Sequence, residues 1–156
     1  AIAVLSDRID GAGVEVNLDI PADLPVVPCD AAKVQGVLIN LVKNAVEAVE
    51  PDVDFDIRSS TAPPPKIGIS ARLDGTFIEL TVRDNGPGIP PETAAHLFEP
   101  FFTTKRTGTG LGLTIAKRIV EAHGGSVLCR PNTPTGTAMV LRLPLQPPEG
   151  VAPLVQ

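Results

Sequence analysis

Hydrophobic and polar residues alternate along several short stretches of the chain, a pattern typical of strands with one buried face. In the first, from Val14 to Ile20, every second residue is aliphatic and the residues between are Glu, Asn or Asp. The same period of two recurs at 67–73 and 78–82, and the Asp74-Gly75 pair between them is a hairpin turn signal. Residues 126–130 and 137–143 predict a second hairpin.

Other stretches repeat hydrophobic residues at helical spacing. Residues 31–50 are predicted to form a helix that Asp30 caps and Pro51 ends. Its apolar stripe consists of Val34, Leu38, Leu41, Val42, Ala45 and Val49. A second long helix is predicted at 110–123, a short one at 91–97 and the end of another at 1–11, with a loop at 51–65.

The predicted elements follow the order helix, strand, helix, two strands, two helices, two strands. Helices and strands in this arrangement pack as layers around one core. We therefore predict an α/β two-layer sandwich, in which one mixed sheet is covered on one face by helices.

Composition favours one globular domain, with 156 residues of which 43% are hydrophobic and 20% charged. The net charge of −5 argues against a surface that binds duplex nucleic acid, although local donors and a metal would still hold a phosphate ligand. No apolar run approaches the roughly 20 residues that cross a bilayer. Cys29 and Cys129 are expected to be ordinary reduced thiols, because two distant cysteines make no zinc signature.

The first chemical signal is the cluster Asp84-Asn85-Gly86-Pro87-Gly88 at the end of a predicted strand. Asp84 has the parity of the aliphatic residues of that strand, so it points toward the buried face, where a carboxylate needs a partner. The exocyclic amine of adenine is a suitable donor, and Gly86 and Gly88 would let the backbone approach a flat ring. The alternative is a common strand-end turn with an Asx-type cap.

A second cluster, Gly108-Thr109-Gly110-Leu111-Gly112-Leu113, leads directly into a predicted helix. Free backbone N–H groups and the helix dipole would face an anion there. The cluster lacks the Lys-Ser/Thr end of a P-loop and the spacing of a dinucleotide fingerprint. The alternative, a flexible linker, poorly explains Leu111 and Leu113 between the glycines.

Asn40 and Asn44 lie four residues apart, on the helix face opposite the apolar stripe. Neutral amide oxygens can bind Mg²⁺ that also holds phosphates, while the alternative is two solvent-facing asparagines.

Between the glycine clusters, Phe98, Phe101 and Phe102 are expected to anchor a segment onto the core. Its polar continuation from Thr103 to Gly108 carries two positive charges and suits a lid over a triphosphate. A generic exposed loop is the alternative.

In this order, the motifs resemble the catalytic and ATP-binding domain of bacterial sensor histidine kinases, members of the gyrase–chaperone–histidine kinase–MutL ATPase superfamily. Residues 40–48 resemble the N box, 84–89 the first glycine box, 98–105 the F box, 108–113 the second glycine box and 136–137 the last one. The string Phe-Phe-Thr-Thr-Lys is similar to kinases of the nitrogen-regulation and oxygen-sensing type. The resemblance implies a Bergerat-type fold with a mostly antiparallel sheet.

The resemblance also implies roles for residues. Asn44 and Asn40 would hold Mg²⁺, Asp84 would read adenine, and Thr137 would do so through water. Lys105 would touch the terminal phosphates, with Lys43 as a weaker candidate. Further contacts to ATP would come from Gly86, Gly88, Ile89, Thr104, Gly108, Gly110, Leu111, Gly112 and Leu113. Asn40 stands where ATPase members carry a glutamate that activates water, which favours phosphoryl transfer over hydrolysis and makes Asn40 and Lys105 the catalytic candidates.

The family transfers the γ-phosphate to a histidine on a separate dimerisation domain, and the usual His-Glu acceptor string is missing here. His96 and His123 are the only histidines, and both lie inside the nucleotide domain. We therefore expect residues 1–13 to be the remnant of a linker helix, 14–144 to be the ATP-binding catalytic domain and 145–156 a disordered tail. The implied partners are that dimerisation and phosphoacceptor domain and a downstream response regulator.

The expected function is donation of the γ-phosphate of Mg·ATP to a histidine, by a monomeric cytoplasmic domain that is either free or part of a membrane-anchored kinase. Three alternatives stay open. They are a self-contained ATPase, a degenerate ATP-binding scaffold and a serine-directed kinase of the anti-sigma type.

Overall fold

The computed structural model describes residues 2–50, 63–105 and 108–146. Five strands form one sheet in the order β1-β2-β3-β5-β4. The strands are β1 (Glu15–Asp19), β2 (Lys66–Asp74), β3 (Phe77–Asp84), β4 (Ser126–Pro131) and β5 (Thr137–Pro144). Only β1 and β2 run parallel, and the other neighbours are antiparallel. The sheet is thus mixed and mostly antiparallel, as predicted.

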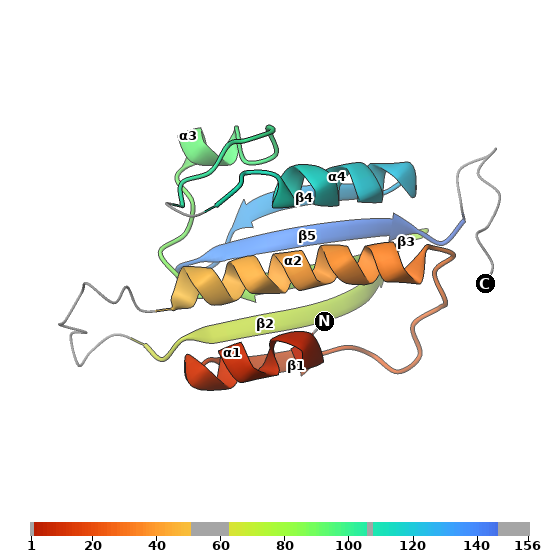
Figure 1. The fold of residues 1–156 in the computed structure, drawn as a ribbon. Coiled ribbons are helices and arrows are strands. Elements are labelled where there is room, and N and C mark those ends of the chain that lie inside the picture. The colour runs from red at the N-terminus through yellow and green to blue at the C-terminus, as the bar shows by residue number, and fades with distance from the viewer. Residues whose placement is uncertain (1, 51–62, 106–107, 147–156) are drawn as a thin grey trace.

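The helices lie on one face of this sheet (Figure 1). They are the 3₁₀ turn η1 (Ile2–Leu5), α1 (Ser6–Gly11), α2 (Ala31–Val49), α3 (Pro91–Ala94) and α4 (Gly112–Ala122). Asp30 caps α2 as predicted, because its side chain accepts a hydrogen bond from the Lys33 N–H. The predicted helix at 91–97 is shorter than expected, since Pro91–Ala94 continues into turns rather than into further helix.

The core lies between the sheet and helices α2 and α4. The stripe of α2 is buried as predicted apart from Leu38, which is half-buried, and Val37 and Val46 widen it. Across from it, Leu80 and Leu141 are register partners on β3 and β5, and Leu141 is fully buried. Aliphatic side chains fill this layer, as the low aromatic content requires.

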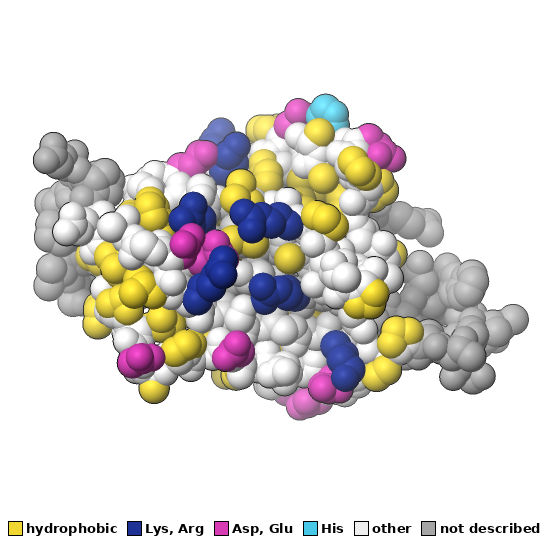
Figure 2. Space-filling view, turned by 180° about the vertical axis from the view of Figure 1, so that it is seen from behind, with side chains coloured by type: hydrophobic (Ala, Val, Ile, Leu, Met, Phe, Trp, Pro, Cys, Tyr) yellow, Lys and Arg dark blue, Asp and Glu magenta, His cyan; other side chains and the backbone are white. Residues whose placement is uncertain are grey.

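None of the described helices covers the opposite face of the sheet, which gathers basic side chains over its strands (Figure 2). Arg72 and Arg142 both reach the carboxylate of Glu79, which is only 6% exposed. Arg83 donates to the Ser70 hydroxyl. These pairs cover the polar face of the central strands.

Strand β1 exists as predicted, but its predicted buried face is wrong for two residues. Val14 is buried, whereas Leu18 and Ile20 are each 53% exposed. Both border a shallow apolar hollow of about 340 Å³ between η1, β1 and α2. The second half of this edge strand faces that hollow instead of a closely packed helix, so the alternation predicts the strand but not the coverage of its face.

Residues 2–12 pack against the same core as the rest of the domain. Ile9 is 5% exposed and belongs to the core cluster, and Ile2, Leu5 and Ala12 pack against that cluster. The origin of residues 1–13 as a linker helix stays a prediction. Most of the predicted 51–65 loop and of the 145–156 tail lies outside the described residues. In the described ranges, no helix has both the length and the apolar character to traverse a lipid bilayer.

Leu141→Ala should lower the free energy of unfolding by about 2–5 kcal/mol, because it empties a fully buried position in the centre of the sheet. Leu73→Ala is the matched control on β2, where the side chain is 52% exposed and the cost should be about 1 kcal/mol or less. Urea unfolding followed by circular dichroism measures both. Both side chains lie on the helix-covered face, so equal losses would contradict the assignment of Leu141 to the centre of the core.

Candidate functional site

Asp84 is the polar residue around which the site is organised. It ends β3, is 5% exposed and faces the helix-covered side, as its parity predicts. Its Oδ1 accepts hydrogen bonds from the Gly86 N–H at 3.0 Å and from the Thr137 N–H at 3.1 Å. In the part of the chain that the structure describes, nothing donates to Oδ2, so one carboxylate oxygen is left for a ligand.

Burial and hydrogen bonding act on the pKa of Asp84 in opposite directions. Burial raises the pKa of Asp84 above its ordinary value, while the N–H groups of Gly86 and Thr137 lower it in part. The backbone carbonyl of Asp84 accepts from the Asn132 side chain at 2.8 Å, which ties the β4–β5 turn to the end of β3. Sequence reasoning did not find Asn132, and a lone asparagine in a turn gives no signal for this role.

Gly86 has a packing role that the sequence did not indicate. A Cβ at this position would lie 2.7 Å from the Ala48 carbonyl oxygen, so only glycine lets the loop after β3 pack against the end of α2. The first glycine cluster therefore joins β3 to α2, and whether it also approaches a flat ring stays a prediction.

The second glycine cluster opens α4 as predicted, with Leu111 at the N-cap position and Gly112 as the first helical residue. No side chain caps this end, which leaves backbone N–H groups available to an anion. The Phe101 N–H donates to the Gly110 carbonyl at 3.0 Å, so the F-box segment and the glycine cluster are tied together.

Asn40 packs against this helix start. A Cβ on Gly112 would lie 2.7 Å from the Asn40 Oδ1, so glycine is needed where α4 meets α2. The Asn40 Nδ2 is buried and has no hydrogen-bond partner among the described residues. A buried amide N–H without a partner is uncommon and indicates a place for a polar ligand.

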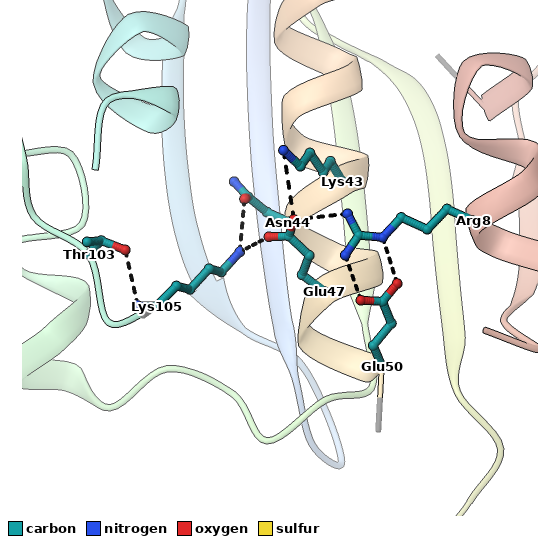
Figure 3. Close-up of polar contacts among 7 residues, drawn as sticks. All are labelled: Arg8, Lys43, Asn44, Glu47, Glu50, Thr103 and Lys105. Atoms are coloured by element: carbon teal, nitrogen blue, oxygen red, sulfur yellow. Dashed lines mark hydrogen bonds and ion pairs between the residues drawn. The ribbon is translucent and has the colours of Figure 1, made fainter. Parts of the chain in front are cut away.

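Asn44, one turn further along α2, meets a cation. Its Oδ1 accepts from the Lys105 Nζ at 3.2 Å, and the same Nζ forms an ion pair with Glu47 (Figure 3). The end of the F box therefore contacts α2, with Lys105 on the face that carries Asn44. The contact predicted for Lys105, with terminal phosphates, stays a prediction.

Glu47 is the carboxylate in the middle of this cluster. Arg8 of α1 binds Glu47 at 3.1 Å and Glu50 at 2.6 Å. The Lys43 ammonium lies 3.9 Å from the Glu47 carboxylate. Burial raises the pKa of Glu47, but Lys105, Arg8 and Lys43 outweigh burial and leave it below its ordinary value. The hydrogen bond from Arg8 likewise lowers the pKa of Glu50.

No role was assigned to Glu47 from the sequence. Its position three residues after Asn44 was the available signal, because residues three apart share a helix face. Arg8 gave no signal, since it reaches Glu47 and Glu50 from a different element of the fold.

The other predicted contact residues surround these groups. Thr104 and Gly108 are exposed, while Gly88, Ile89, Gly110, Leu111 and Leu113 are half-buried. The aromatic anchor is confirmed only in part: Phe98 packs against the core, whereas Phe101 is 75% exposed. Arg106 and Thr107, within the predicted lid, lie outside the described residues.

Both histidines make hydrogen bonds or ion pairs within the domain. The His123 Nε2 accepts from the Asp30 N–H at 3.1 Å, so its Nδ1 carries the proton that faces the Ile119 carbonyl at 2.6 Å. His96 Nδ1 lies 2.8 Å from Glu99 on an exposed turn. His123 therefore fastens the end of α4 to the start of α2.

The donor set suits a hard cation that arrives with phosphates. The Asn44 Oδ1 faces a cation already, in the form of the Lys105 ammonium, and amide oxygens are ligands that Mg²⁺ accepts. Asn40 is less suited as the structure stands, because its amide oxygen faces Gly112 on α4. The two asparagines share a helix face but contact different elements.

Comparison with known proteins agrees with this geometry. The sequence profile described as "Histidine kinase-, DNA gyrase B-, and HSP90-like ATPase" matches residues 29–147. The sensory histidine kinase/phosphatase NtrB of Rhizobium meliloti (strain 1021) is 39% identical over 122 residues, which are 74% of this chain and 31% of NtrB. The chain thus spans about a third of the length of this relative.

Solved structures share the fold. The catalytic domain of histidine kinase ThkA superposes with a TM-score of 0.78 at 30% identity, covering 94% of this chain and 90% of that domain. A crystal structure of ThkA in complex with the response regulator protein TrrA matches with a TM-score of 0.75 at 27% identity, covering 95% of this chain and 39% of that one. The predicted fold is confirmed by these matches.

Replacement of Asp84 by Asn should change the pH dependence of stability. A carboxyl whose pKa is raised by folding stabilises the protein fully below its unfolded pKa of about 3.8, and this contribution is lost as pH rises through the folded pKa. The stability of Asp84→Asn relative to the unmodified chain should therefore increase with pH in that window. Thermal unfolding measured between acid and neutral pH checks this, and a difference that falls with pH would contradict it.

Proposed function

Because the chain belongs to the histidine kinase-, DNA gyrase B- and HSP90-like ATPase family, we propose that it binds Mg·ATP and donates the γ-phosphate to a histidine on a separate dimerisation domain. The observation that carries the proposal is the buried carboxylate of Asp84, whose Oδ1 is held by two backbone N–H groups while Oδ2 meets no described donor. A buried carboxylate oxygen of this kind suits the exocyclic amine of adenine. Thr137, which is 6% exposed, lies beside it and would contact the base through water.

The phosphates would lie at the start of α4, where uncapped backbone N–H groups and the helix dipole favour an anion. Gly108, Gly110, Leu111, Gly112 and Leu113 form or adjoin this end. Lys105 would bind the terminal phosphates after leaving Glu47, with Thr104 beside it. Asn44 would hold Mg²⁺, which when bound neutralises charge on the phosphates, and Asn40 would join it only after its amide oxygen turns away from Gly112.

Phosphoryl transfer is favoured over hydrolysis by the chemistry of Asn40. The Asn40 amide cannot accept a proton from water, as a general base would have to. Its buried Nδ2, which can only donate, has no acceptor among the described residues. The work left to this chain is to position the γ-phosphate and stabilise its charge, which are the main contributions to catalysis in phosphoryl transfer. The accepting histidine would come from another domain, because His123 is engaged in structural bonds.

A response regulator is the proposed downstream partner, as TrrA is for ThkA in the solved complex. We place the domain in the cytoplasm, where ATP is available, and expect the isolated chain to be a monomer.

Asp84→Asn should weaken binding of a non-hydrolysable ATP analogue by about 1–3 kcal/mol, because the amide cannot offer a charged acceptor to the adenine amine. Calorimetric titration in Mg²⁺ measures this loss. Asp74→Asn is the matched control, since Asp74 lies in an exposed pair with Arg142 on the other face of the sheet. Failure of the unmodified chain to bind at millimolar ligand would refute the proposed function, and an unchanged affinity in Asp84→Asn would refute the role of Asp84.

The acceptor is tested with labelled ATP and a separately produced dimerisation domain that carries its histidine. We expect label on that domain which is lost in acid and retained in base, the behaviour of phosphohistidine. Acid-stable label would indicate a serine-directed kinase, and steady phosphate release by the chain alone would indicate a self-contained ATPase. Binding without transfer would indicate a scaffold.

A further inference from the structure

Three cations from different parts of the fold converge on the single carboxylate of Glu47 (Figure 3). Arg8 comes from α1, Lys43 from the preceding turn of α2, and Lys105 from the end of the F box. The Glu47 side chain is 20% exposed, so these charges are screened less than they would be on an open surface. Glu47 is therefore the point where α1 and the end of the F box contact the same group.

The contacts of Lys105 conflict with the role proposed for it. Its ammonium binds Asn44 Oδ1 and Glu47 Oε2, and so covers the amide oxygen that Mg²⁺ would take. A cation at Asn44 and a phosphate near Lys105 both require the ammonium to leave. Departure of Lys105 would leave Glu47 with less positive charge beside it, facing incoming phosphates of the same sign.

Arg8 is placed to offset that loss. Its guanidinium makes two bonds to Glu50, at 2.7 and 2.6 Å, and one to Glu47 at 3.1 Å. The paired bonds to Glu50 fix its plane, and the remaining donor points at Glu47. Arg8 is thus a cation already in contact with Glu47 that does not need to move when Lys105 departs.

We propose that Glu47 is a positioning residue shared by Arg8 and Lys105. In the absence of nucleotide, Glu47 holds Lys105 over Asn44; when Mg·ATP binds, Lys105 moves to the phosphates and Arg8 keeps Glu47 neutralised. The packing of α1 against α2 then sets how readily Lys105 is released. This inference rests on the proposed function, because it assumes that Lys105 contacts the terminal phosphates.

The competing explanation is structural. Arg8 could serve only to fasten α1 to the end of α2 through Glu50, with Glu47 as a bystander. The two explanations differ in whether the effect of changing Arg8 depends on Glu47, which a double-mutant cycle measures.

The test uses the 156-residue chain and calorimetric titration with a non-hydrolysable ATP analogue and with ADP, both in Mg²⁺. The ratio of the two dissociation constants isolates contacts to the terminal phosphate from binding of adenine. Arg8→Gln should reduce the preference for the ATP analogue by about two- to fivefold, the size expected for a partly exposed ion pair. Glu47→Gln should increase that preference, because Lys105 is no longer held away from the phosphates.

In the Glu47→Gln background, Arg8→Gln should change the preference less than twofold. Lys33→Gln removes an equal charge at the far end of α2, where it pairs with Asp30, and should leave the preference unchanged. Thermal unfolding of each variant confirms that it is folded. Should Arg8→Gln not fold, Glu47→Gln alone decides the question, since its preference must rise.

Two results would overturn the inference while leaving the proposed function intact. One is that Arg8→Gln lowers the preference for the ATP analogue equally with and without Glu47. The other is that Glu47→Gln itself lowers that preference. Loss of all nucleotide binding in the unmodified chain would instead overturn the proposed function.

Discussion

The contact between Asp84 and the backbone of Thr137 connects the separate parts of this domain. It joins the last residue of β3 to the first residue of β5, which lies 53 positions later in the chain. The same aspartate holds the Gly86 N–H, and through Gly86 the loop after β3 packs against the end of α2. A carboxylate at this depth costs free energy unless its hydrogen bonds are satisfied, so the surrounding backbone must be placed accurately before any ligand binds.

Electrostatic pairing accounts for the polar side of α2. The chain has a net charge of −5, yet Glu47 and Glu50 are matched by cations from α1 and from the end of the F box. Each exposed pair contributes little by itself, but pairs that share a carboxylate are coupled. The site can therefore respond to elements that do not contact the ligand.

Local patterns were sufficient to predict the elements. The period of two predicted β1, β2 and β3, Asp74-Gly75 predicted the β2–β3 turn, and the apolar stripe of α2 proved to be buried almost as expected. The exposure of Leu18 and Ile20 could not be predicted, because alternation shows which side chains share a face but not whether another element covers that face. The end of α3 was predicted wrongly because the sequences of turns and helices differ little over so few residues.

The site was predictable where one element carries the chemistry and unpredictable where several meet. The buried position of Asp84 was predicted from the parity of its strand. The start of α4 was predicted from the glycines that precede a helix. The cluster of Arg8, Glu47 and Lys105 depends on three segments brought together only by the fold, and residue spacing contains no information about such meetings. The same holds for the contact of Asn40 with Gly112.

His123 has a mechanical consequence. By bonding to the Asp30 N–H and facing the Ile119 carbonyl, it pins the C-terminal end of α4 to the N-terminal end of α2, far from the glycine-rich start of α4. Helices α2 and α4 run antiparallel and are held together at this end, so α4 can move away from α2 only by rotating about it. Any adjustment of α4 to a bound anion would then be a small rotation with its largest displacement at Gly112, where the amide of Asn40 touches it.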